Sequence, residues 1–261
     1  MLSHKMDLAE LEDEMKKRII ALVSVVTLLS ALFLVGCGSK KDTIIVGTEA
    51  GFAPYEYMKG NEVVGIDMDI AKEIADYLGK ELEIRNMEFD GALLAVQNGT
   101  IDFVAAGVSV DEERLEKMDF SIDYVNSTEV VVVNKENPTV ASIDDLDNKI
   151  VGVQQGNIAD FWVEENIQAK EIRRYTKFAQ AAEDLKNGKI DCIVMDQFPA
   201  EDMVATNPEL TILDGVLFED KYAIAVQKGN KELLDDINTV IEQLKKDGKI
   251  EQFTAEHTKK N

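Results

Sequence analysis

The chain has 261 residues, of which 50 are Asp or Glu and 28 are Lys or Arg, so its formal net charge is −22. We therefore expect no nucleic-acid partner, because phosphate binding requires clustered Lys and Arg. Hydrophobic residues make up 45% of the chain. That share is ordinary for a folded protein and excludes a disordered acidic chain.

The N-terminal region has the order of charged and apolar residues that is typical of a secretory signal. A basic triplet at residues 16–18 precedes an apolar run at residues 19–35, which leads through a small residue to Cys37. The acidic residues within 1–14 do not fit such a signal, and they favour translation starting at Met15. The alternative is a transmembrane helix, because the run is near the lower length limit for spanning a bilayer.

The sequence Leu-Val-Gly-Cys that ends at Cys37 resembles the lipobox of bacterial lipoproteins. The resemblance implies a signal peptide at residues 1–36, cleavage before Cys37 and diacylation of its thiol. Residues 37–42 would then form a lipidated tether, held stably on the membrane by its acyl chains. We therefore expect a protein anchored by lipid on the extracytoplasmic face of the cell membrane.

Short apolar segments alternate with amphipathic ones along the first half of the remaining chain. Ile66, Ile70, Ile74 and Leu78 recur at helical spacing, and Gly79 follows as a helix-ending residue. The other expected elements are strands at residues 43–48, 81–85 and 101–105 and helices at residues 91–98 and 111–117.

The same alternation continues in the second half of the chain. We expect strands at residues 130–133, 150–153, 189–195 and 222–226, and helices at residues 158–165, 178–186 and 233–246. An alternation of strands and helices predicts an α/β fold with a largely parallel sheet.

Cysteine and histidine are scarce in the part of the chain that follows the predicted cleavage. With Cys37 lipidated, Cys192 has no partner for a disulfide within the chain. Cys192 lies in an apolar segment, where a lone cysteine is usually a small buried hydrophobic residue. His257 is the one histidine after Cys37. A catalytic thiol and a zinc site are therefore not expected, and no cofactor or metal is implied.

Five stretches, in order along the chain, resemble the polar amino-acid family of solute-binding proteins of ABC transporters. They are the loop at 47–56, the sequence Gly-Ile-Asp-Met-Asp-Ile at 65–70, the loop at 107–124, the loop at 151–157 and the strand end at 194–196. The likeness extends from about Thr43 to Phe253, so it is far more specific than any single motif.

The resemblance implies a two-lobed periplasmic-binding-protein fold with the ligand in the cleft between the lobes. Lobe 1 would comprise residues 43–123 and 223–261, and lobe 2 would comprise residues 129–217. The two crossing segments, at residues 124–128 and 218–222, would act as hinges. We expect the protein to be a monomer.

An amino acid is a zwitterion, so its site needs a fixed cation. The resemblance and the spacing Gly-x-Ser-x-x-x-x-Arg make Arg114 the candidate for the ligand carboxylate, with the Ser109 hydroxyl as a further donor. A guanidinium can hold a carboxylate through two parallel hydrogen bonds. The alternative is a solvated helix charge paired with Asp111 or Glu116.

The site also needs a fixed anion, for which Asp196 is the candidate. Asp196 follows the strand at 189–195, and its carboxylate would accept from the ligand ammonium together with the Gly107 carbonyl. The alternative is a plain helix N-cap, a position that Asp favours. Because Arg114 and Asp196 would come from different lobes, the ligand would bridge the lobes and shift the balance towards closure.

The pocket for the ligand side chain follows from the resemblance. Phe52 and Phe89 correspond to positions that enclose that side chain, although a Phe is more often plain core. Glu49 corresponds to an acid that reaches a cationic side chain, and its alternative is one surface acid among many. Gln154 and Asn157 belong to the third loop, where Asn157 replaces the more common Thr.

These observations predict a binding protein rather than an enzyme. It would capture a polar L-amino acid and deliver it to ABC permease subunits. Glu49 and two aromatic faces favour arginine or lysine, and cystine and glutamine stay open. Two other classes also stay open. One is a dehydratase of the cyclohexadienyl type on the same fold, with Glu49 or Asp196 as general acid. The other is a sensor subunit that presents its ligand to a receptor.

Overall fold

The computed structural model describes residues 42–259. The predicted signal peptide at 1–36, the predicted lipidation at Cys37 and the tether as far as residue 41 lie outside the described residues. Within the described range, no helix is both long and apolar enough to cross a membrane.

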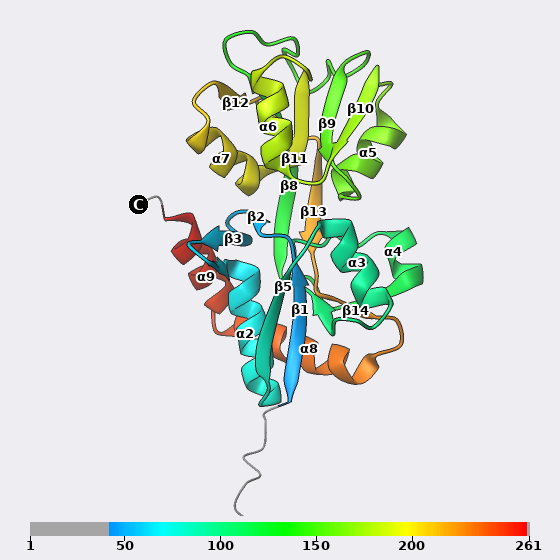
Figure 1. The fold of residues 1–261 in the computed structure, drawn as a ribbon, viewed down its shortest axis with the longest axis vertical. Coiled ribbons are helices and arrows are strands. Elements are labelled where there is room, and N and C mark those ends of the chain that lie inside the picture. Colours follow the sequence, from blue (N-terminus) through cyan, green and yellow to red (C-terminus); the bar gives the residue numbers. More distant parts are fainter. Residues whose placement is uncertain (1–41, 260–261) are drawn as a thin grey trace, which may run out of the picture. The chain divides into compact units, whose positions relative to one another are not determined.

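Two mixed β-sheets, each flanked by helices, form two lobes (Figure 1). The first sheet contains, in spatial order, β5 (Glu81–Asn86), β1 (Thr43–Thr48), β6 (Phe103–Val104), β14 (Ala225–Gln227) and β7 (Met118–Phe120). β1 runs parallel to β5 and β6, whereas β14 runs antiparallel to β6 and β7. The helices of this lobe are α2 (Ile66–Leu78), α3 (Phe89–Gln97), α4 (Glu112–Lys117), α8 (Lys231–Lys246) and α9 (Lys249–Thr258).

The second sheet belongs to the other lobe. Its strands, in spatial order, are β10 (Glu171–Tyr175), β9 (Ile150–Gln154), β11 (Cys192–Asp196), β8 (Val125–Asn134) and β12 (Leu210–Ile212), and β13 (Phe218–Tyr222) also pairs with β8. Its helices are α5 (Ile158–Asn166), α6 (Phe178–Lys186) and α7 (Gln197–Thr206). The predicted α/β architecture with two lobes is confirmed.

The strands β8 and β13 run between the two lobes (Figure 1). They pair antiparallel, from Val125 opposite Tyr222 to Glu129 opposite Phe218. The lobe boundaries and hinge residues stay predictions, because they concern which parts move.

Helices with a strong apolar period lie where the sequence predicts them. α6 has the predicted bounds, and α2 ends at Gly79, whose φ of 67° is a left-handed conformation that glycine adopts without steric cost. α3 begins at Phe89, two residues before the predicted start at Gly91. Gly91 is therefore inside the first turn, although glycine is a poor helix former. The buried side chain of Phe89 packs this turn onto the core.

The predicted single strand at 222–226 is wrong, because two strands meet there. Tyr222 ends β13 opposite Val125, whereas Ala225 begins β14 opposite Val104 and Phe120. Between them the chain changes from one sheet to the other. All residues from Tyr222 to Val226 are buried. The apolar pattern is therefore continuous and does not indicate where the chain passes from one sheet to the other.

Other expected strands differ in their ends. The strand predicted at 101–105 is reduced to β6, the strand at 130–133 is part of the longer β8, and the strand predicted at 189–195 begins at Cys192. The sequence reading missed the three-stranded sheet of β2 (Gly51–Phe52), β3 (Glu56–Lys59) and β4 (Glu62–Val64). Its strands are too short and too polar to show a clear period.

Cys192 is fully buried in β11. Burial raises the pKa of its thiol to about 12. A thiol in that state is a poor nucleophile at neutral pH, which agrees with the predicted role as a small hydrophobic residue.

Candidate functional site

Loops from both lobes meet at one place in the fold. The loops after β1 and β6 belong to the first lobe, and the loop after β9 and the end of β11 belong to the second. In open α/β sheets, ligands bind at the carboxyl ends of strands. Three hydrogen bonds between side chains or carbonyls of the described residues join these loops across the lobes. Arg114 Nη2 donates to the Gly156 carbonyl over 2.7 Å, Gln155 Nε2 donates to Asp90 Oδ2 over 2.8 Å, and Gln154 Nε2 donates to Glu49 Oε2 over 3.3 Å.

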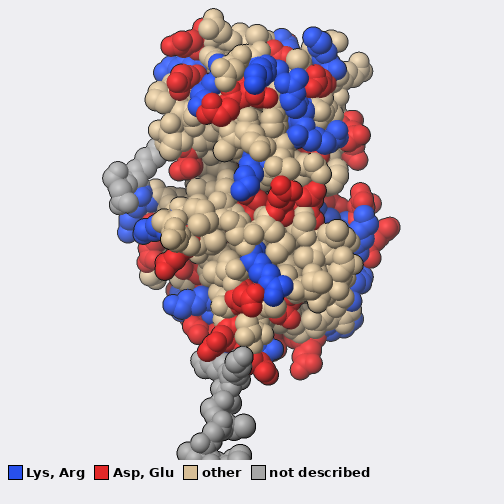
Figure 2. Space-filling model, viewed as in Figure 1, with Lys and Arg blue, Asp and Glu red and all other residues tan. Residues whose placement is uncertain are grey.

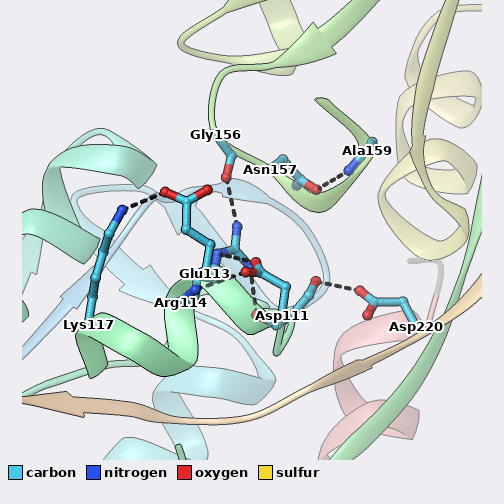
Figure 3. A network of polar contacts seen from close by, with 9 residues as sticks. Asp111, Glu113, Arg114, Lys117, Gly156, Asn157, Ala159 and Asp220 are labelled. Atoms are coloured by element: carbon cyan, nitrogen blue, oxygen red, sulfur yellow. Dashed lines mark hydrogen bonds and ion pairs between the residues drawn. The ribbon is translucent and has the colours of Figure 1, made fainter. Parts of the chain in front are cut away.

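Arg114 lies at the centre of a network of polar contacts (Figure 3). Its backbone N–H donates to the side chain of Asp111, the N-cap of α4. Its guanidinium donates to the Ser109 carbonyl over 2.6 Å and forms an ion pair with Asp111 at 3.1 Å. The ion pair agrees with the alternative interpretation, but the residue is only 5% exposed and is not a solvated helix charge.

Two phenylalanines flank the guanidinium of Arg114. Its Cζ lies 5.6 Å from the ring centroid of Phe89 and 5.8 Å from that of Phe161. Phe161 comes from α5 of the second lobe and was missed in the sequence. Burial lowers the pKa of Arg114, yet a guanidinium stays protonated in proteins. The site therefore holds a positive charge between aromatic faces.

Asp196 lies at the end of β11 with 1% exposure. It occupies the N-cap position of α7, but its side chain makes no capping hydrogen bond, so the plain N-cap interpretation is wrong. Its Oδ1 accepts a short hydrogen bond from Tyr222 and a bond of 3.3 Å from Ser127. Its Oδ2 is buried and has no hydrogen-bond partner in the described part of the chain. Burial raises the pKa of this carboxyl to about 6.

Two more acids surround Asp196. Glu129, Asp196 and Asp220 each place a carboxylate oxygen within 4.8 Å of the others. Glu129 is fully buried in β8, and Asp220 in β13 accepts from Ser109 Oγ over 2.5 Å. The predicted donor Ser109 thus donates to Asp220. Three acids so close together attract a cationic group, a metal ion or protons.

Gly107 has a φ of 55°, and a Cβ there would lie 2.8 Å from Cε1 of Phe52. Both facts require glycine. Its N–H donates to Asp67 Oδ2 over 2.9 Å, which holds the loop after β6. The predicted role of the Gly107 carbonyl towards a ligand stays a prediction.

Phe52 brings an aromatic face from the first lobe to the second. Its ring stacks on Phe178 of α6 with a centroid distance of 6.1 Å and on Tyr55 with a distance of 5.8 Å. Phe52 is 3% exposed. Phe178 therefore lies beside Phe52, one of the two phenylalanines predicted for the side-chain pocket, and was not predicted from the sequence.

Glu49 is buried rather than on the surface, so its alternative interpretation is wrong. Its Oε2 accepts from Gln154 Nε2 over 3.3 Å, and its Oε1 lies 3.8 Å from Nζ of Lys177. Oε1 has no hydrogen-bond partner in the range 42–259. Burial raises the pKa of Glu49, whereas Lys177 and Gln154 act in the opposite direction.

Asn157 has a definite local role. It is the N-cap of α5, and its side chain accepts from the Ala159 N–H over 3.2 Å. A Thr or an Asn can serve equally in this position, which explains the departure from the more common Thr. The Asn157 side chain thus bonds within the helix, and Arg114 bonds the carbonyl of the preceding Gly156 (Figure 3).

A pocket of 720 Å³ lies between α4 and α5. Its lining includes Asp111, Phe161 and Asp220, which surround Arg114 and Ser109. On the face shown in Figure 2, basic side chains are scattered among acidic ones over both lobes.

Not all the predicted residues contact one another. Arg114 contacts Ser109, and Glu49 contacts Gln154. Arg114 and Asp196 are linked through Ser109, which bonds both Arg114 and Asp220, and through Asp220, which lies close to Asp196. The residues missed by sequence reasoning are Glu129, Phe161, Lys177, Phe178, Asp220 and Tyr222. One signal was present for Glu129, because an acid within the valine-rich strand 125–134 requires a partner or a proton.

Residues 44–260 match the family model of bacterial extracellular solute-binding proteins, family 3. The L-cystine-binding protein TcyJ of Escherichia coli (strain K12) is 31% identical over 218 residues, which are 82% of this chain and 82% of that protein. The arginine-binding extracellular protein ArtP of Bacillus subtilis (strain 168) is 29% identical over 92% of this chain and 96% of its own length.

Solved structures give a similar result. The structure of an ancestral arginine-binding protein bound to arginine is 38% identical to this chain and superposes with a TM-score of 0.78. The match covers 84% of this chain and all of that one. The match therefore covers both lobes of the described residues.

Proposed function

This chain belongs to family 3 of the bacterial extracellular solute-binding proteins, and we propose that its cleft binds a cationic L-amino acid for import by an ABC permease. The chain is a solute-binding protein rather than an enzyme, as its family and relatives show. Its ligand, its site residues and its lipid anchor at Cys37 are parts of the proposal.

One observation carries the proposal. A buried cation in the first lobe and a buried anion with an unpaired oxygen in the second lobe lie where loops of both lobes meet, and Ser109 and Asp220 link them. Arg114 would take the ligand carboxylate, exchanging its bond to the Gly156 carbonyl for a charge-assisted pair. Oδ2 of Asp196, which has no donor of its own among residues 42–259, would accept from the ligand ammonium.

The ligand side chain would extend towards Glu49 along the ring of Phe52. Oε1 of Glu49 is buried without a hydrogen-bond donor in the described residues, so an ammonium or guanidinium group would satisfy it. The stacked rings of Phe52 and Phe178 would offer a cation–π surface. The similarity to the arginine-binding protein ArtP and to the ancestral arginine-binding protein supports arginine.

Cystine is the second candidate. Lys177 lies 3.8 Å from Glu49, so the far end of the pocket carries a cation as well as an anion. Cystine has a second zwitterionic end, which would pair its distal ammonium with Glu49 and its distal carboxylate with Lys177. The similarity to the L-cystine-binding protein TcyJ supports this alternative.

A thermal-shift screen of residues 38–261 against the standard amino acids and cystine tests the proposal. Ligand at a hundred times its dissociation constant stabilises the folded state by about 2.7 kcal/mol. A shift with arginine or lysine supports the cationic ligand, and a shift with cystine alone supports the second candidate. If none of these compounds shifts the transition, the proposed ligand classes are wrong.

Two variants separate the candidates further. Glu49→Gln should weaken arginine by about 1–3 kcal/mol, the value of a charged hydrogen bond, and spare neutral ligands. Lys177→Met should spare arginine and weaken cystine by a similar amount, about 1–3 kcal/mol. Glu73→Gln is the matched control, because Glu73 pairs with a lysine outside the cleft. Unchanged arginine affinity in Glu49→Gln would remove the cationic assignment.

A further inference from the structure

The pair of Glu129 and Asp196 is not explained by zwitterion binding alone. The two residues lie directly opposite each other where β8 pairs with β11. Their exposures are 0% and 1%. Like charges directly opposite each other destabilise a sheet, and burial away from water makes the repulsion stronger. Two full negative charges at this position therefore require compensation.

The described surroundings do not supply that compensation to Glu129. Both of its Oε atoms and Oδ2 of Asp196 are buried without a hydrogen-bond donor in residues 42–259. Oδ1 of Asp196, in contrast, accepts from Tyr222 and Ser127. Two groups that can only accept hydrogen bonds when ionised thus face each other, and a single proton between them would satisfy both.

We propose that Glu129 keeps a proton at neutral pH and donates it to Oδ2 of Asp196, which makes Glu129 a positioning residue of the ammonium subsite. The inference rests on the proposed function, in which Asp196 holds the ligand ammonium. The pair then carries one negative charge, which matches the single positive charge of an ammonium. Each carboxylate oxygen accepts two hydrogen bonds, so Asp196 keeps capacity for the ligand.

The electrostatic environment supports this assignment. Burial, followed by the charge of Asp196, raises the pKa of Glu129 well above its usual range, and Asp220 acts in the same direction. Burial raises the pKa of Asp196 to about 6. The titratable groups that face the pair are Asp220 and Tyr222 from β13 and Tyr55 and Glu56 from the first lobe. None of these groups is a cation, so they favour retention of the proton.

A hard metal ion among Glu129, Asp196 and Asp220 is the competing interpretation, because their oxygens lie within 4.8 Å of one another. An ion there would occupy the carboxylate that the ligand ammonium needs. A proton satisfies the same oxygens and leaves Asp196 accessible, so the proton is the better fit.

Infrared spectroscopy of the ligand-free protein at pH 7.5 tests the proton directly. We expect a carbonyl band of protonated carboxylic acid with a component that Glu129→Gln removes and Glu219→Gln retains, beside any contribution of the buried Glu56. Glu219 is an exposed acid of β13 and serves as the matched control. This measurement needs no ligand, so its outcome does not depend on the proposed function. Absence of the band, or a band of unchanged intensity in Glu129→Gln, would overturn the proposal.

Calorimetric titration with the amino acid found in the screen tests the positioning role. Glu129→Gln should keep the affinity at pH 7.5 within about threefold, because an amide N–H replaces the carboxyl O–H as donor. Glu129→Leu, which has no donor, should lose about tenfold or more, the worth of one charge-assisted hydrogen bond. In the wild type, affinity should fall about tenfold for each pH unit below about 6, as Asp196 takes up a second proton.

Two results would contradict the positioning role. A loss of more than tenfold in Glu129→Gln would mean that Glu129 is ionised and attracts the ammonium by its charge. Affinity that depends on added calcium or sodium and disappears after chelation or dialysis would mean that a metal ion occupies the site. If no amino acid binds the wild type but the infrared band is present and assigned to Glu129, the proposed function fails and the proton assignment survives.

Discussion

Replacement of Arg114 by Met gives the most direct test of the amino-acid site. Every amino acid carries a carboxylate, so a residue that holds this group should matter equally for every ligand that the wild type binds. Met has a similar length and no charge. The change removes the donors to the carbonyls of Ser109 and Gly156 and the ion pair with Asp111.

The magnitude follows from the burial of the guanidinium. Arg114 is 5% exposed and lies between the rings of Phe89 and Phe161. Loss of one partner of a buried charge pair costs about 3–5 kcal/mol. Since 1.4 kcal/mol is tenfold in affinity, the expected loss is about 10²- to 10⁴-fold. Arg114→Lys should also weaken binding, because an ammonium lacks the planar fork that holds a carboxylate at two points.

Calorimetry measures the affinity, and thermal unfolding of the ligand-free variants reports any separate loss of stability. Lys117→Met is the matched control. Lys117 belongs to the same helix α4, and it forms an exposed ion pair with Glu113, which should be worth little. If Arg114→Met binds amino acids within about threefold of the wild type, or if the loss differs strongly between ligands, the carboxylate assignment is wrong.

Four further predictions concern closure, anchoring, the glycine of the ligand loop and pH. Saturating ligand should reduce the radius of gyration in small-angle scattering, because the lobes rotate about the two crossing strands; an unchanged curve with confirmed binding would contradict this. Cys37→Ser should give an unprocessed or released protein, whereas Cys192→Ser, in a buried position, should keep location and binding; continued acyl labelling of Cys37→Ser would disprove the lipid anchor. Gly107→Ala should cost about 1–2 kcal/mol in unfolding free energy, because φ is 55° and the added Cβ meets Phe52, whereas Gly91→Ala has open space and should be neutral or stabilising. The ligand-free protein should lose stability as pH rises from about 4 to about 6, because burial raises the pKa of Asp67 to about 6, so the folded state binds a proton that the unfolded state has released. In chemical unfolding, Asp67→Asn should reduce this loss.

Residues with a strong local pattern were predictable from the sequence. α6 has the predicted bounds because Phe178, Ala181, Ala182 and Leu185 alternate at helical spacing on one buried face. The break between β13 and β14 was not predictable, because it depends on which strand each residue pairs with. Pairing partners are set by contacts far apart in the chain, and a buried strand has no period that marks a change of sheet.

The candidate site shows the same division. Arg114, Ser109 and Asp196 stand in recognisable motifs, so the resemblance indicates them by position. Glu129 and Asp220 come from the two crossing strands, and only the pairing register brings them to Asp196. Phe161 lies in α5 and Lys177 is the N-cap of α6, both in the second lobe. Their contacts with Arg114 and Glu49 of the first lobe depend on how the two lobes pack, which the sequence does not show. Sequence therefore indicates the groups proposed to touch the ligand better than those that surround them.

The contacts of Asp67 show how the most recognisable motif holds the loop of the proposed ligand site. Asp67 is fully buried at the start of α2, where it accepts from the Gly107 N–H and from the Tyr124 hydroxyl. Gly107 belongs to the loop that precedes Ser109 and Arg114, and Tyr124 lies immediately before β8. One carboxyl group thus fixes the ligand loop and the start of a crossing strand to the same helix. If the lobes move as predicted, this arrangement would keep Arg114 with the first lobe, while Asp196 and Gly156 would move with the second. A ligand that binds Arg114 and Asp196 together can therefore favour closure, because only the closed arrangement offers both charges to it.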